Sequence, residues 1–104
     1  MESTDEFGNF LVNTVRGSAV IADPMVEPIG EAIKRLTRVQ SRDQSSIDKR
    51  RGLIRKIIKH FKGKHAPEFH DPHRLEEMLA QLSWADDVLE RKRNTRDVSQ
   101  QTKG

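Results

Sequence analysis

The residues of this sequence that are best suited to bind a partner are positively charged and lie close together. From Lys49 to Pro67 the chain has eight lysines and arginines and no aspartate or glutamate. On a helix, where successive residues are 100° apart, six of these cations fall on one face. The six are Lys49, Arg51, Arg55, Lys56, Lys59 and Lys62. Such a row can contact phosphates and release condensed counterions, so we expect it to be the binding site for a nucleic acid.

The same row has a purely structural interpretation, as the solvated face of a core helix. A solvated face ordinarily mixes signs, because like charges three or four residues apart repel by a few tenths of a kcal/mol. Residues 34–67 hold twelve cations and two acids, whereas residues 68–90 hold one cation and seven acids. We therefore expect the positive charge of the row to be compensated, either by phosphates or by the acidic segment that follows it.

The surrounding residue types favour a duplex over a single strand. The chain has no tyrosine, and Phe61 belongs to the apolar face of the same predicted helix, so aromatic platforms for unpaired bases are missing from the basic region. No zinc finger or RNA-recognition motif is present. We expect binding to RNA or DNA by shape and backbone charge, and a homodimer would present two such faces.

Two other functions, membrane association and nuclear import, would suit parts of the basic segment. Residues 50–64 combine a cationic side with an aliphatic side, as membrane-surface helices do, but the other helices compete for the aliphatic side. We therefore do not expect membrane association. Residues 49–56 resemble a nuclear-import signal in composition, which is a weakly specific pattern.

Catalysis and metal binding have little support. Four histidines fall within residues 60–73, but their spacing fits no metal motif, and the chain has no cysteine. No phosphate-binding loop, dinucleotide fingerprint or catalytic triad is recognisable. We expect no enzyme activity, no metal and no cofactor.

An apolar stripe in the acidic segment offers a second interaction surface. Its members repeat with heptad spacing, at Leu75, Met78, Leu82, Ala85 and Leu89. Such a stripe is typical of a core face, a dimer seam or a groove-binding helix. Trp84 lies off that line and either widens the core or stands partly exposed as a contact residue. The alternative function is an adaptor or inhibitor subunit that binds a larger protein complex through Leu82, Trp84 and Leu89 or through the N-terminal apolar segment.

Three helices are predicted to position these residues. The first covers residues 28–39, with Pro28 in its first turn, where a missing amide hydrogen costs nothing. The second covers residues 46–62 and carries the basic row. The third covers residues 72–92 and begins after Asp71, which caps it.

The N-terminal third of the chain gives a weaker pattern. Residues 10–21 have β-branched residues on both sides of Gly17, which predicts a short hairpin. Residues 1–8 and 94–104 are polar and are expected to be flexible, which leaves residues 9–93 as a single domain.

The bulk composition sets the fold class. Leu, Ile, Val and Phe make 25 of the 104 residues, enough for one thin core. No run approaches the roughly 18 apolar residues of a membrane span, and the acidic start is unlike a secretion signal. We expect a mainly α protein, a small three-helix bundle with or without the hairpin, in the cytoplasm or nucleus. Its size and segregated charge suit an accessory subunit or a viral or phage regulator.

Overall fold

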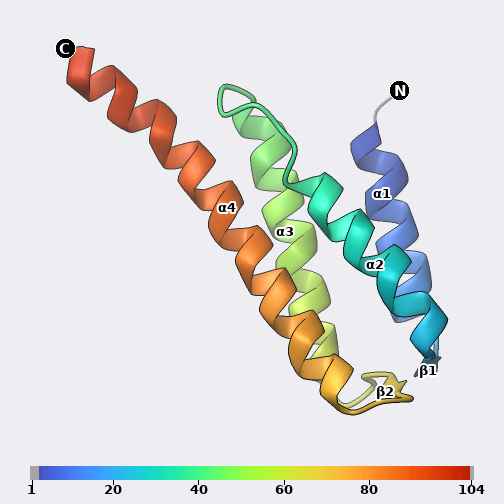
Figure 1. Ribbon diagram of the computed structural model, residues 1–104. Helices are drawn as coiled ribbons and strands as arrows, with labels where there is room; N and C mark the ends of the chain where they lie inside the picture. The colour runs from blue at the N-terminus through green and yellow to red at the C-terminus, as the bar shows by residue number, and fades with distance from the viewer. Residues whose placement is uncertain (1–2, 104) are drawn as a thin grey trace.

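The structure is a computed structural model that describes the backbone of residues 3–103 and the side chains of residues 6–94. Over these residues the chain forms a bundle of four helices and two very short strands (Figure 1). The elements are α1 (Ser3–Leu11), the π-helical turn η1 (Val12–Arg16), β1 (Val20–Ile21), α2 (Asp23–Leu36), α3 (Gln44–Phe61), β2 (Glu68–Phe69) and α4 (His73–Lys103). The predicted mainly helical bundle is confirmed, with one more helix than expected.

The end of the additional helix α1 and the π-helical turn η1 occupy most of the segment predicted as a hairpin, residues 10–21, and that prediction is wrong. Phe7, Leu11 and Val15 recur at four-residue spacing and form one helical stripe, with Leu11 and Val15 fully buried. The β-branched residues that suggested strands are overridden by this packing, because strand propensity depends strongly on context. Within residues 10–21, the strand conformation is confined to Val20 and Ile21.

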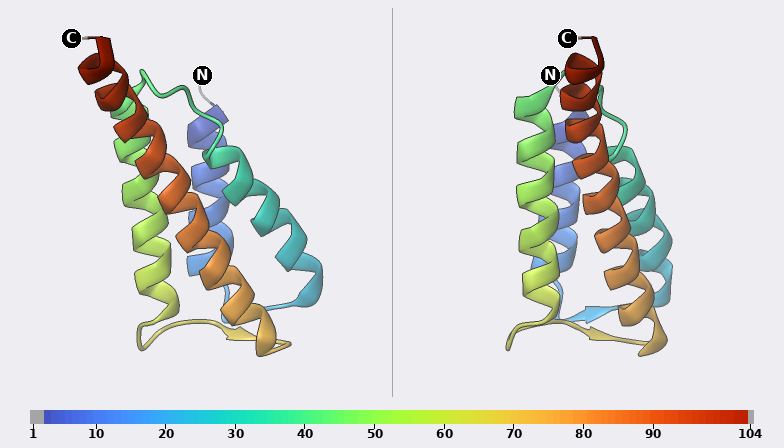
Figure 2. Two further views of the ribbon diagram at one scale, coloured as in Figure 1. Left: turned by 60° about the vertical axis from the view of Figure 1, so that its left-hand side comes forward. Right: turned by 90° about the vertical axis from the view of Figure 1, so that its left-hand side faces the viewer.

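These two residues pair with a distant segment instead of an adjacent one. β1 and β2 are parallel, with Val20 opposite Glu68 and Ile21 opposite Phe69. The amide of Glu68 donates to the carbonyl of Ala19 at 2.9 Å. Because α2 and α4 each follow one of the paired strands, they leave the same end of the bundle in the same direction, while α1 and α3 run the opposite way (Figure 2).

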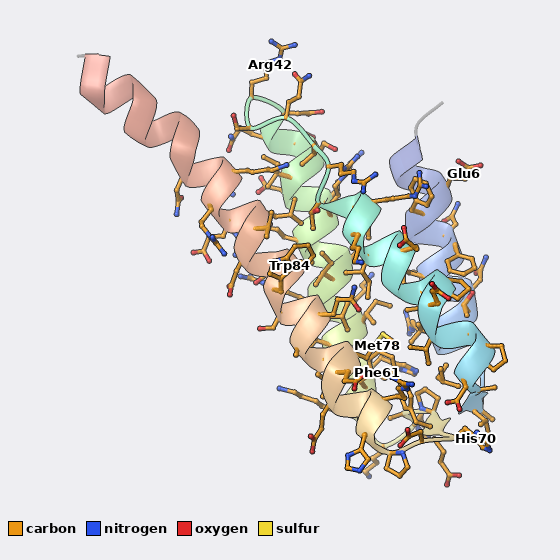
Figure 3. The ribbon with its side chains drawn as sticks, in the orientation of Figure 1. Glu6, Arg42, Phe61, His70, Met78 and Trp84 are labelled. Atoms are coloured by element: carbon orange, nitrogen blue, oxygen red, sulfur yellow. The ribbon has the colours of Figure 1, made fainter. Side chains whose placement is uncertain are left out.

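The core lies between all four helices. Its buried apolar residues form one cluster: Leu11, Val15, Ile21, Ile29, Ala32, Ile33, Leu36, Ile47, Ile54, Ile57, Phe61, Met78, Leu82, Ala85 and Leu89. The most extensive contact is between α3 and α4. Phe61 and Met78 lie toward the strand end of the bundle (Figure 3). The apolar faces predicted for residues 46–62 and 72–92 are therefore confirmed as core faces.

Several helix ends differ from the predictions. α2 begins at Asp23 instead of residue 28, because Pro24 fits the first turn, and Pro28 stands inside the helix on its exposed side. Asp43 caps α3, accepting from the amide of Ser46 at 3.4 Å. Asp71 caps α4 as predicted, accepting from the amide of His73 at 3.1 Å.

The two ends of the chain carry more helix than expected. α1 begins at Ser3, and α4 continues past residue 92 to Lys103. The flexibility predicted for residues 1–8 and 94–104 stays a prediction. No helix in the described part of the chain is long and apolar enough to cross a membrane.

Candidate nucleic-acid interface

The six predicted cations all lie on α3 or at its C-terminal cap, but they divide into two groups by what they contact. Five of them are exposed, and Arg51 is half-buried. One group faces α4, which packs along one side of α3 (Figure 1). The other group has no acidic partner among the described residues. The sequence places all six on one face, and the structure divides that face.

The group that faces α4 consists of Arg51 and Arg55, and both are close to an acid. Arg51 Nε donates to Asp86 Oδ1 at 3.0 Å, with side chains that are only 15% and 18% exposed. Arg51 Nη2 lies 3.9 Å from Glu90 Oε1. Arg55 Nε lies 3.5 Å from Asp86 Oδ2, although Arg55 is 62% exposed. For these two arginines the acidic helix supplies the compensation.

The outer group consists of four lysines, Lys49, Lys56, Lys59 and Lys62, which we call the outer lysine face. All four are exposed, and none forms an ion pair within the described part of the structure. Gly52 lies among them and has no neighbour within 4 Å of where a Cβ would stand. The outer lysine face is therefore open to a macromolecular partner.

Arg16 extends this positive surface onto a second element, and sequence reasoning missed it. Arg16 ends η1 and lines a cavity of about 240 Å³ together with Lys56, Lys59 and His60 of α3. Because residues 10–21 are predicted as a hairpin, the sequence does not predict that Arg16 lies beside α3. The four-residue spacing of Leu11 and Val15 is the signal that would have continued a helix to Arg16 and brought it to α3.

Other cations serve the fold, and they gather at the C-terminal end of α2. Arg50 is buried, and its Nη1 donates to the carbonyl of Leu36 at 2.9 Å. Lys92 Nζ donates to the carbonyls of Thr37 at 2.6 Å and Val39 at 3.0 Å. Carbonyls at a helix end lack helical partners, so cations there satisfy them and favour the helix dipole.

Two further arginines, both on α4, interact with acidic side chains. Arg93 of α4 pairs with Asp48 of α3, beside the Arg51 and Asp86 pair in the same interface. At the start of α4, the hydrogen bond from Arg74 to Glu77 raises the pKa of Arg74 above its ordinary value. The ion pairs of Arg51 with Asp86 and of Arg93 with Asp48 thus neutralise charges of both helices in the contact between α3 and α4.

The predicted protein interface on residues 72–92 is only partly at the surface. Leu82 and Leu89 are fully buried, so neither side chain is accessible to a partner in the folded chain. They face the core because the heptad stripe of α4 packs on α3. Trp84 is 44% exposed, and it stands on α4 at mid-height of the bundle (Figure 3).

The four histidines do not converge. His60 packs on Phe61, while His70 Nδ1 lies 3.6 Å from Asp23 Oδ2. His65 and His73 are exposed. Among the residues whose side chains are described, no group of three or more histidine or acidic side chains is placed to hold a metal ion.

Fold and surface together define a small helical bundle with one side of α3 lined by exposed lysines. Comparison of the chain with family models, with curated proteins and with solved structures gives no match in any of the three.

Proposed function

We propose that this chain is a non-enzymatic, nucleic-acid-binding accessory protein whose outer lysine face contacts the phosphate backbone of a duplex by charge and shape. One observation carries the proposal. The outer lysine face is exposed and lacks acidic partners in the described structure, whereas Arg51 and Arg55 on the neighbouring side of the same helix are compensated by Asp86.

The dimensions of the outer lysine face suit a duplex. At 1.5 Å per residue, the distance along α3 from Lys49 to Lys62 is about 20 Å. That length matches about six base pairs at 3.4 Å each. Contact with three or four phosphates in this span corresponds to modest, sequence-independent affinity, with Kd values on the order of 10⁻⁴ to 10⁻⁶ M at physiological salt.

Helix electrostatics alone do not account for the whole face. Cations in the last turn of a helix are stabilised by about 0.3–1 kcal/mol, which offsets the mutual repulsion of Lys59 and Lys62. Lys49 and Lys56 lie outside the last turn of α3, where this effect has decayed. Phosphates would compensate these two lysines, for which the described structure has no ion pair.

Salt dependence of duplex binding tests the proposal. Fluorescence anisotropy with a duplex of arbitrary sequence should give a log–log slope of about −2.7 to −3.6, since each of three or four phosphate contacts contributes about −0.9. In the variant Lys56→Gln/Lys59→Gln the slope should be shallower by about 1.8. A variant with the same change in charge at the C-terminal end of α2 and just beyond it, Lys34→Gln/Arg38→Gln, should keep the original slope.

Two results would contradict the proposal. One is a flat salt response of the unmodified protein. The other is an equal loss of slope in both double variants, because an equal loss would show a dependence on net charge without a defined face. Circular dichroism of each variant confirms that the helices are retained.

Trp84 supports a second candidate function, the binding of a larger protein. A tryptophan that is 44% exposed is the kind of residue that dominates interface energies. Trp84→Ser should then dissociate a protein complex while leaving the free energy of unfolding within about 1 kcal/mol of the original. A second copy of this chain is one such partner, and sedimentation of both forms measures it.

A further inference from the structure

The cavity between η1 and α3 has a uniform chemical character. Its volume is about 240 Å³, and its walls come from Arg16 of η1 and from Lys56, Lys59 and His60 of α3. These lining residues are three cations and one imidazole, with no acid among them. None of the three cations forms an ion pair with another described residue. The side chains that line the cavity thus include three cations and no carboxylate to neutralise them.

Size and donor chemistry together indicate a phosphate group. The cavity is smaller than the roughly 300–1,000 Å³ clefts that enclose drug-sized ligands. A phosphate offers only acceptors to its surroundings, and arginine and lysine are its usual partners. His60 Nε2 is buried and has no hydrogen-bond partner in the described structure, although buried polar atoms nearly always have one.

The helix dipoles offer a competing account, and they explain only part of the arrangement. Arg16 lies in the last turn of η1, and Lys59 and His60 lie in the last turn of α3, so each favours a helix end. Lys56 lies before that turn and gains little from the dipole. The dipoles also give no reason for the ends of η1 and α3 to direct their cations at one shared cavity.

We propose that this cavity holds one phosphate of the duplex backbone and anchors it between η1 and α3. The inference rests on the proposed function and adds a residue outside the outer lysine face. Contact from two elements fixes the orientation of the protein on the backbone, which a single row of lysines does not. Arg16 is therefore a binding residue, although it lies far from the basic segment in the sequence.

Arg16→Gln is the decisive variant because Arg16 is exposed and belongs to a different element from the outer lysine face. Loss of one phosphate contact should make the log–log slope shallower by about 0.9. Between 50 and 200 mM salt, the fall in duplex affinity should then be smaller by about 3.5-fold. Arg16→Lys should retain the slope, and Lys34→Gln, which removes one exposed charge away from the cavity, should also retain it.

The outcome for the cavity is separable from the outcome for the proposed function. If the unmodified protein binds duplex with a steep slope and Arg16→Gln behaves as Lys34→Gln does, the anchoring site is overturned and the proposed function stands. If the slope becomes shallower in Arg16→Gln but not in Arg16→Lys or Lys34→Gln, the anchoring site is supported.

A titration with inorganic phosphate distinguishes a site for phosphate in general from a site for nucleic acid. At constant ionic strength balanced with chloride, the amide resonances of Arg16, Lys59 and His60 should shift and saturate, and Arg16→Gln should weaken this response. If phosphate saturates these shifts but no duplex binds at low salt, the proposal that the bound phosphate belongs to a nucleic acid is contradicted. If neither ligand binds, both proposals fail.

Discussion

The side of α3 that faces α4 and the outer lysine face both carry cations, but only the first has acids paired with it. Arg51 is 15% exposed and is bound by Asp86, while Lys56 is exposed with no ion-pair partner in the described structure. The two residues are five positions apart in the same basic segment. The availability of a cation on α3 therefore depends on which helix packs beside it, and a count of charges along the sequence does not reveal this.

The largest expected effect concerns a cation that serves the fold. Arg50→Ala removes the donor to the Leu36 carbonyl and the packing of a buried stem. We expect the free energy of unfolding to fall by about 2–4 kcal/mol, as for a buried hydrogen bond from a charged group plus lost packing. Urea denaturation measures it, with the exposed neighbour Lys49→Ala as control. Equal effects of both substitutions would remove the distinction between structural and available cations.

Asp86→Asn alters the paired side directly. It removes the charge that compensates Arg51 and Arg55, so we expect the free energy of unfolding to fall by about 1–3 kcal/mol. Duplex affinity should rise, because two arginines become available beside the outer lysine face. Asp87→Asn removes the same charge from an exposed residue without a described ion pair. If Asp87→Asn raises the affinity equally, the pairing seen at Asp86 has no role in binding.

Gly52→Ala tests how closely a partner approaches the outer side. A Cβ at Gly52 meets no atom within 4 Å, and alanine favours a helix interior over glycine by about 1 kcal/mol. We expect a gain in stability of about 0.5–1 kcal/mol and unchanged duplex affinity, because lysine side chains reach phosphates from a distance. Gly63→Ala is the control for a glycine without free space around it, because its Cβ would stand 3.3 Å from the Lys59 carbonyl oxygen. A several-fold loss of affinity in Gly52→Ala would indicate contact with the α3 backbone itself.

The smallest expected effect on stability belongs to the outer lysine face. Lys56→Gln/Lys59→Gln should leave the free energy of unfolding within about 0.5 kcal/mol of the original, because exposed substitutions away from structural contacts rarely matter more. Thermal denaturation at low salt provides the measurement. A loss above about 1 kcal/mol would show that these lysines support the fold, and any loss of duplex binding would then have a structural cause.

The sequence predicts the interior of the bundle better than its surface. Ile54 and Leu82 follow a helical period that only a buried face requires, and both are buried. Asp71 caps α4 because its short side chain reaches a free amide two residues away. These features depend on local spacing, which is fully present in the chain.

The surface depends on neighbours that the sequence does not specify. Arg51 and Lys56 both belong to the wide polar arc of α3, and only the position of α4 assigns an acid to the first. Trp84 fits either a core edge or a surface by its spacing, and it is exposed. Arg16 was assigned to the wrong element because its β-branched neighbours favour strands in isolation. In each case a contact between distant segments decides the outcome.

The pairing of β1 with β2 also bears on the order in which the chain folds. Val20 and Glu68 are far apart in the sequence, so their pairing closes a long loop and loses chain entropy before it gains two hydrogen bonds. α3 and α4 are consecutive and share the largest helix contact, so their association has a lower entropic barrier. We expect this helical pair to form the folding nucleus, with closure of the strand pair among the last events.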